Sequence, residues 1–141
     1  MTNAAKLKLC NKSLGLTLML MLASGIQLEV TSGKFGWSVW AHVILGIVLT
    51  GLSLYHIFLH YRFSNWFSRI AGNRNAATRI LWWVFLLTVV TGIAVTVKWL
   101  ADPGHTSLGG VHGKIGFLMV VVAFVHVAGH NGRKKRSHHF R

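Results

Sequence analysis

The sequence predicts an all-α protein, an integral membrane four-helix bundle that contains an internal two-helix repeat. First, 52% of the 141 residues are hydrophobic and only 12% are charged, with a mean hydropathy of +0.51. Second, four apolar stretches approach the roughly 20 residues that a membrane-spanning helix needs. Third, histidines recur at a fixed offset. Because a soluble domain carries roughly twice this charged fraction, we expect a single membrane domain over residues 1–141.

Four spanning helices are expected at about residues 14–30, 39–61, 80–100 and 111–130. None of these stretches shows the sustained alternation of a membrane strand. The first has an alternative interpretation, because three lysines, an apolar run and Ala23-Ser24-Gly25 resemble a secretory signal peptide. Its apolar character continues to Val30, however, which favours a spanning helix.

The basic residues predict an orientation. Lys and Arg number 15 against two acidic residues, a net charge of +13, and 12 of the 15 lie before the first stretch, between the second and third, or after the fourth. Basic residues collect on the cytoplasmic side, so we expect both termini in the cytoplasm. Contact with membrane lipid explains the charge, and we expect no nucleic-acid partner.

The scarcity of acids and cysteines excludes several kinds of chemistry. Glu29 and Asp102 are the only acidic residues, too few for paired-carboxylate catalysis, a calcium site or a magnesium-phosphate site. Cys10 is the only cysteine, which excludes an intrachain disulfide, a Cys-rich zinc site and c-type haem attachment. No flavin or nicotinamide fingerprint is present. Nine histidines remain to be explained.

The histidines form part of a repeat. Three histidines and a glycine of the second stretch recur 70 residues later: His42 and His112, His56 and His126, His60 and His130, and Gly46 and Gly116. Ser24-Gly25-Ile26 is likewise echoed 67 residues later by Thr91-Gly92-Ile93. The chain is therefore interpreted as two helix pairs of parallel topology, with equivalent histidines at equal depth.

The spacing of these histidines favours haem. His42 and His56 are 14 residues apart, which is about 21 Å along a helix and about 40° in azimuth. The equivalent residues His112 and His126 repeat this spacing. If the two helices face each other, each depth offers two opposed imidazoles, as six-coordinate haem iron requires. We expect two b-type haems per chain, with His42/His112 as ligands of the outer and His56/His126 as ligands of the inner.

Four glycines, Gly25, Gly46, Gly92 and Gly116, are expected to make room beside the porphyrins. Close helix packing explains each of them about equally well.

The ends of the histidine helices leave alternatives open. His60 and His130 also share a face with the outer pair, so they could serve as the inner ligands in place of His56 and His126. Arg62, Arg79 and Arg133 are candidate propionate partners, or simply a solvated basic rim. The i, i+4 histidines could instead bind zinc or copper, although that leaves His42 and His112 unexplained.

These residues resemble the bacterial di-haem four-helix cytochromes b. The group includes the cytochrome b-561 type and the cytochrome b subunits of hydrogenases and formate dehydrogenases, and the cytochrome b core of the bc complexes is similar. The resemblance covers Leu14 to His130 and lies in the 14-residue histidine pairs of two helices. It implies electron transfer across the membrane, to or from quinone.

The expected function is therefore an electron relay or a subunit of a redox complex, with a redox partner protein and with oligomer formation left open. Two alternatives remain. One is a stand-alone quinone reductase that oxidises a small anion such as superoxide, steered by Lys34, Lys98 and Lys114. The other is a histidine-based protein for metal binding or transport.

Overall fold

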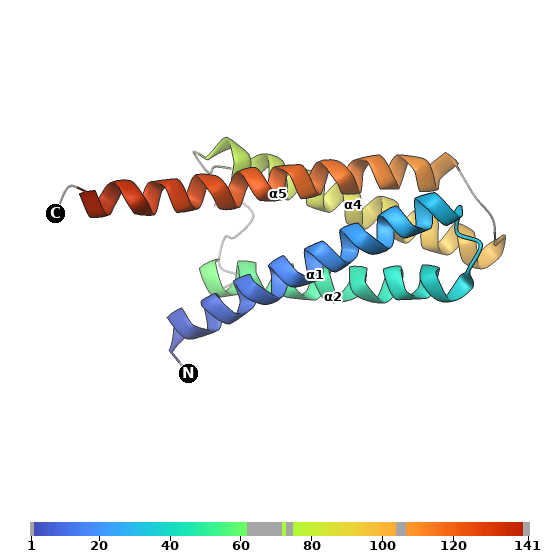
Figure 1. The fold of residues 1–141 in the computed structure, drawn as a ribbon, viewed down its shortest axis with the longest axis horizontal. Coiled ribbons are helices and arrows are strands. Elements are labelled where there is room, and N and C mark those ends of the chain that lie inside the picture. Colours follow the sequence, from blue (N-terminus) through green and yellow to red (C-terminus); the bar gives the residue numbers. More distant parts are fainter. Residues whose placement is uncertain (1, 62–71, 73–74, 104–106, 140–141) are drawn as a thin grey trace.

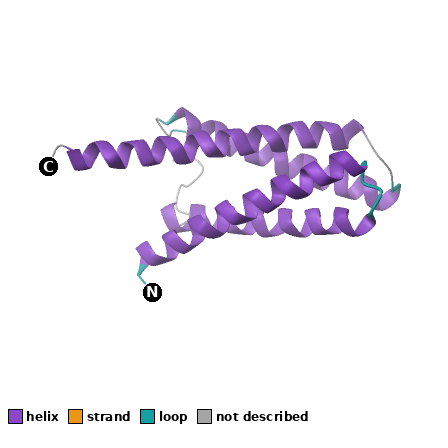
Figure 2. Cartoon of the chain, viewed as in Figure 1, coloured by secondary structure: helices purple, strands orange, loops and turns teal. Residues whose placement is uncertain are grey.

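The protein, analysed as a computed structural model, consists of four long helices (Figure 1). The structure describes residues 2–61, 72, 75–103 and 107–139, apart from the side chains of 61 and 130–139. The helices are α1 (Asn3–Thr31), α2 (Gly36–Tyr61), α4 (Ala76–Ala101) and α5 (Ser107–His139). In these ranges there are helices and loops but no strand (Figure 2). Each helix is long and apolar enough to cross a membrane, so the predicted all-α fold with four spanning helices is confirmed.

Two helices extend beyond the expected apolar stretches. α1 begins at Asn3 instead of about residue 14, with the Thr2 side chain accepting a hydrogen bond from the Ala5 amide at 3.3 Å. α5 continues to His139 instead of ending near residue 130, although its membrane-compatible part is Ser107–Gly129. Lysine and arginine are good helix formers, so a helix continues past the point where hydropathy ends the span.

Two short connections fold the chain into hairpins. Between α1 and α2, Ser32 and Gly33 adopt positive φ angles of 50° and 66°, and the Gly33 amide donates to the Leu28 carbonyl at 3.0 Å. α4 ends at Ala101 and is capped by Asp102, which precedes Pro103, a residue without the amide proton that a helix needs. The last turns of α1 and α4 and the first turns of α2 and α5 lie at one end of the bundle, here called the hairpin end, and the start of α1 and the end of α5 lie toward the other, the terminus end (Figure 1).

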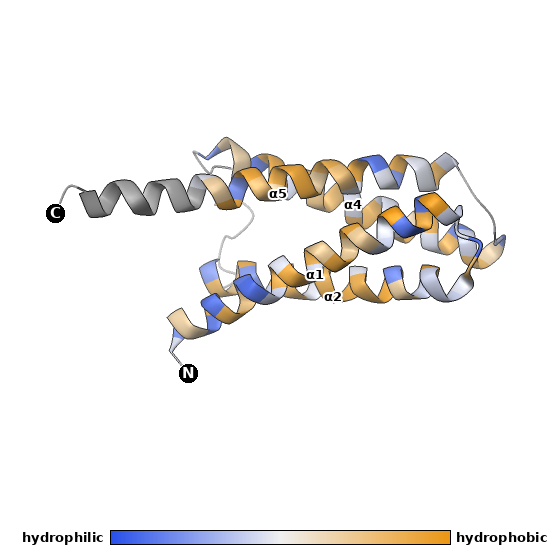
Figure 3. Ribbon diagram, viewed as in Figure 1, coloured by the Kyte–Doolittle hydropathy of each residue, from blue (hydrophilic) through white to orange (hydrophobic). Residues whose placement is uncertain are grey.

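The helices pack mainly within each hairpin, α1 against α2 and α4 against α5, and the hairpins meet chiefly through α1 and α5. A small core cluster of Leu49, Val84 and Met119 joins three helices. Most other apolar side chains point outward, such as Ile47, which is 68% exposed, and apolar residues colour all four helices (Figure 3). Such an apolar exterior around a thin core is typical of a bundle that faces lipid.

The core cluster gives a stability prediction. Leu49→Ala should lower the free energy of unfolding by about 2 kcal/mol or more, because Leu49 is only 7% exposed and its loss leaves a cavity. Ile47→Ala is the matched control, since its side chain faces outward on the same helix. Denaturant titration in detergent micelles measures both, and equal losses would contradict the packing described.

Candidate functional site

The first histidine pair joins the two hairpins near the hairpin end. His42 projects from α2 and His112 from α5, with ring centroids 6.2 Å apart and ring planes at 85°. Both side chains are half-buried. The two imidazoles that the repeat predicts to face each other are therefore brought together.

A hydroxyl of the preceding helix fixes the His42 ring. Ser24 Oγ lies 2.8 Å from His42 Nδ1 and also donates to the Met21 carbonyl at 3.0 Å. A hydroxyl has one proton, and that of Ser24 is used on the carbonyl. With that proton on the carbonyl, Ser24 accepts from Nδ1–H of a neutral His42 ring, and this assignment leaves Nε2 with a free lone pair.

The second hairpin repeats this arrangement. Thr91 Oγ1 lies 3.1 Å from His112 Nδ1 and donates to the Leu87 carbonyl at 2.7 Å. By the same reasoning Nδ1 of His112 carries the proton and Nε2 the lone pair. An imidazole whose other nitrogen donates a hydrogen bond is how proteins usually hold a metal-ligating histidine.

Glycines next to these hydroxyl residues lie against the imidazoles. A Cβ added at Gly92 would stand 3.1 Å from His112 Cε1, and one added at Gly25 would stand 3.5 Å from His42 Cε1. Gly92 therefore makes room for the His112 ring itself, a role more local than the two expected from the sequence, whereas a Cβ at Gly25 would be in ordinary contact with the His42 ring. A Cβ at Gly46 would touch Met21 at 3.8 Å, and one at Gly116 would meet nothing within 4 Å.

The spacing of the first pair fits a metal held between two imidazoles. A metal–imidazole bond is about 2 Å, and a ring nitrogen lies roughly 1 Å from its ring centroid, so two rings on opposite sides of one ion have centroids about 6 Å apart. The observed centroid distance of 6.2 Å agrees with that spacing, and it also lies in the range of two rings packed edge to face. The donor set is also suitable, because each ring offers an unprotonated nitrogen.

The second histidine pair lies toward the terminus end. His56 of α2 and His126 of α5 are close enough to interact electrostatically. Thr78 Oγ1 lies 3.3 Å from His126 Nδ1. His56 Nδ1 is buried and has no hydrogen-bond partner in the described part of the chain. The hydroxyl tether therefore occurs on one side of this pair, whereas the first pair has it on both.

The structure describes only some of the alternative inner ligands and candidate propionate partners. The His60 ring lies one turn from His56, with centroids 4.7 Å apart. Arg79 is exposed at the start of α4. Arg62 and the side chains of His130 and Arg133 lie outside the described residues. Among the described residues, no group of three or more histidine, cysteine or acidic side chains is arranged to hold a metal ion.

An apolar layer separates the two pairs. Leu49 stands seven residues from both His42 and His56, and belongs to the core cluster with Val84 and Met119. Met119 in turn stands seven residues from each α5 histidine. The site therefore consists of two histidine levels with a cluster of buried apolar side chains between them.

Sequence reasoning missed the three residues that hold the histidines. In the sequence, Ser24 and Thr91 stand out only through the repeat, and no pattern distinguishes Thr78. The signal was present, because a hydroxyl residue followed by glycine recurs 67 residues later. The sequence also gives no sign that Trp40 of α2 and Trp99 of α4 pack edge to face across the hairpins, with ring centroids 5.9 Å apart.

Comparisons with protein-family models, curated proteins and solved structures gave no match to this chain. The function proposed below therefore rests on the residues and their geometry.

The space around an added Cβ predicts opposite effects of a glycine-to-alanine substitution at Gly92 and at Gly116. Gly92→Ala should destabilise the protein by about 1 kcal/mol or more, because its new methyl group crowds the His112 ring. Gly116→Ala should be neutral or stabilising, because the space is open and alanine favours a helix. Unfolding midpoints in detergent measure both variants, and a Gly92→Ala protein as stable as the wild type would contradict the close contact.

The hydroxyl tethers predict the tautomer of the first pair. In cofactor-free protein with ¹⁵N-labelled histidine, His42 and His112 should each show a protonated Nδ1 and an unprotonated Nε2. Thr91→Val should weaken this preference in His112, whose ring also meets the Thr88 backbone, and leave that of His42 unchanged. Protonation at Nε2 in the wild type would show that the hydroxyls act as donors to the rings.

Proposed function

We propose that this chain is a membrane cytochrome of the b type, which holds two haems at different depths and passes electrons across the bilayer. The observation that carries the proposal is the first histidine pair, with its 6.2 Å spacing and its two hydroxyl tethers. Neutral imidazole is a common axial ligand of haem iron. When bound, haem would supply reversible one-electron chemistry.

The residues of the chain would bind and orient the two groups. Nε2 of His42 and His112 would be the ligands at the hairpin end, and His56 with His126 those at the terminus end. Ser24 and Thr91 would keep each ring of the first pair in the ligating tautomer. The apolar layer around Leu49 and Met119 would exclude water from the space between the two levels.

The partners and orientation belong to the same proposal. Because 12 of the 15 basic residues precede the first apolar stretch, lie between the second and third, or follow the fourth, the terminus end would face the cytoplasm of a bacterial cell. A chain without a flavin or nicotinamide fingerprint would act as a relay between an outer redox protein and quinone. The resemblance to di-haem cytochromes b points to the same role.

Haem content tests the proposal. Full-length protein purified after expression with a haem supply should contain close to two b-type haems per chain, measured by extraction and absorption spectroscopy. His112→Ala and His126→Ala should each reduce the content to about one, because each removes an axial ligand from a different level.

His60→Ala is the matched control, since it removes an imidazole one turn from His56 on the same helix. It should retain both haems. A loss of one haem in His60→Ala, with no loss in His56→Ala, would assign the inner ligand to His60. A colourless protein that binds zinc stoichiometrically would overturn the proposal in favour of a metal-binding protein.

A further inference from the structure

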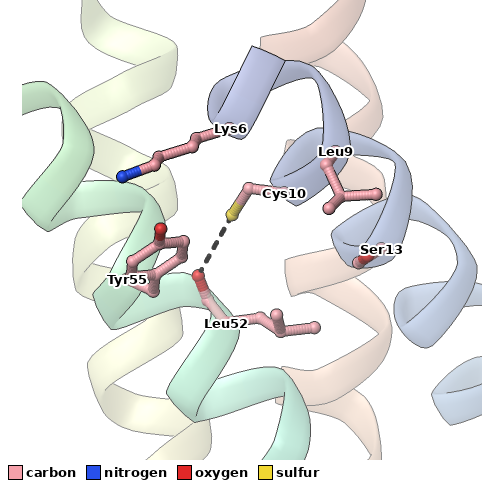
Figure 4. Close-up of a pocket in the computed structure, with 6 residues that line it drawn as sticks. All are labelled: Lys6, Leu9, Cys10, Ser13, Leu52 and Tyr55. Atoms are coloured by element: carbon pink, nitrogen blue, oxygen red, sulfur yellow. Dashed lines mark hydrogen bonds between the residues drawn. The ribbon is translucent and has the colours of Figure 1, made fainter. Parts of the chain in front are cut away.

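A pocket of about 240 Å³ lies between α1 and α2 toward the terminus end, outside both histidine pairs. Its lining comes from two helices: Lys6, Leu9, Cys10 and Ser13 of α1, and Leu52 and Tyr55 of α2 (Figure 4). The Lys6 side chain extends from α1 toward α2, on the side where the Tyr55 hydroxyl lies (Figure 4). The pocket thus combines an amine and hydroxyls with an apolar lining.

The Lys6 amine has no acidic side chain near it. Glu29 lies 23 residues further along the same helix, about 35 Å away, and Asp102 lies at the hairpin end. These are the only acidic residues of the chain. Lys6 is exposed, so its amine is accessible to a ligand, and neither acidic side chain of the chain lies near enough to compete for it.

The floor, mouth and depth of the pocket indicate which kind of ligand it can hold. The Cys10 thiol is 4% exposed and donates to the Leu52 carbonyl at 3.7 Å, so it closes the floor of the pocket. The Tyr55 side chain is 43% exposed and that of Leu9 is 58% exposed, so the mouth opens outward. Lys6 precedes the first apolar stretch by eight residues, or about 12 Å, which places it at headgroup depth.

We propose that this pocket binds an anionic phospholipid, with Lys6 and Tyr55 at the phosphate and Leu9 and Leu52 against the start of an acyl chain. Basic pockets between membrane helices on the cytoplasmic side bind acidic headgroups. A quinone has the apolar ring for such a pocket but no charge to compensate the Lys6 amine. No histidine lines the pocket, so this site rests on the proposed orientation of the chain but not on haem binding.

Lipid binding to the full-length, delipidated protein tests this site. Phosphatidylglycerol, added at increasing ratio in neutral detergent and followed by native mass spectrometry, should bind as one tight copy. Phosphatidylcholine and inorganic phosphate should bind at least tenfold more weakly, because one lacks the net charge and the other the acyl chain. Lys6→Gln should weaken phosphatidylglycerol binding about fivefold, the usual effect of one basic residue near a membrane surface.

Lys8→Gln is the matched control, because Lys8 is exposed on the same helix and does not line the pocket. It should change the affinity less than twofold. Tyr55→Phe should weaken binding by a smaller factor than Lys6→Gln, because it removes a hydroxyl and retains the ring. Equal losses in Lys6→Gln and Lys8→Gln, or displacement of the lipid by a short-chain quinone, would overturn the proposal.

Discussion

The structure depends on one hydrogen bond made twice, from a histidine ring to a hydroxyl of the preceding helix. An imidazole inside a membrane bundle is costly unless its polar atoms are satisfied. Ser24 and Thr91 satisfy Nδ1 of His42 and His112, and each uses its own proton on a carbonyl one turn back. The bond therefore positions the ring, fixes its tautomer and leaves one nitrogen available to a ligand.

This constraint also explains the shape of the bundle around it. Glycine follows the hydroxyl residue in both hairpins: a Cβ at Gly92 would crowd Cε1 of His112, and one at Gly25 would be in ordinary contact with Cε1 of His42. Each hairpin thus holds its own histidine, and the two histidines meet between hairpins that otherwise touch mainly through α1 and α5. Beneath this level, Leu49, Val84 and Met119 fill the interior with apolar side chains. Leu49 and Met119 each stand seven residues from the histidines of their helix, so the apolar cluster lies between the two histidine levels.

Much of this was predictable from the sequence, because hydropathy and spacing are local properties. The four helices follow from apolar length, and the meeting of His42 with His112 follows from the 70-residue offset. The helix ends were less predictable, because lysines before residue 14 continue a helix as well as apolar residues do. The roles of Gly25 and Gly92 were not predictable, because only the distance to Cε1 distinguishes space for a ring from space for a porphyrin. The unequal tethers of His56 and His126 likewise required three-dimensional contacts.

The most direct test of the central claim is an experimental density map of the full-length protein purified with its native cofactors. At a resolution that separates side chains, it should show flat density between the His42 and His112 rings, with Nε2 of each ring toward its centre and Nδ1 toward Ser24 or Thr91. Two rings in direct contact, or a single spherical ion between them, would contradict the account.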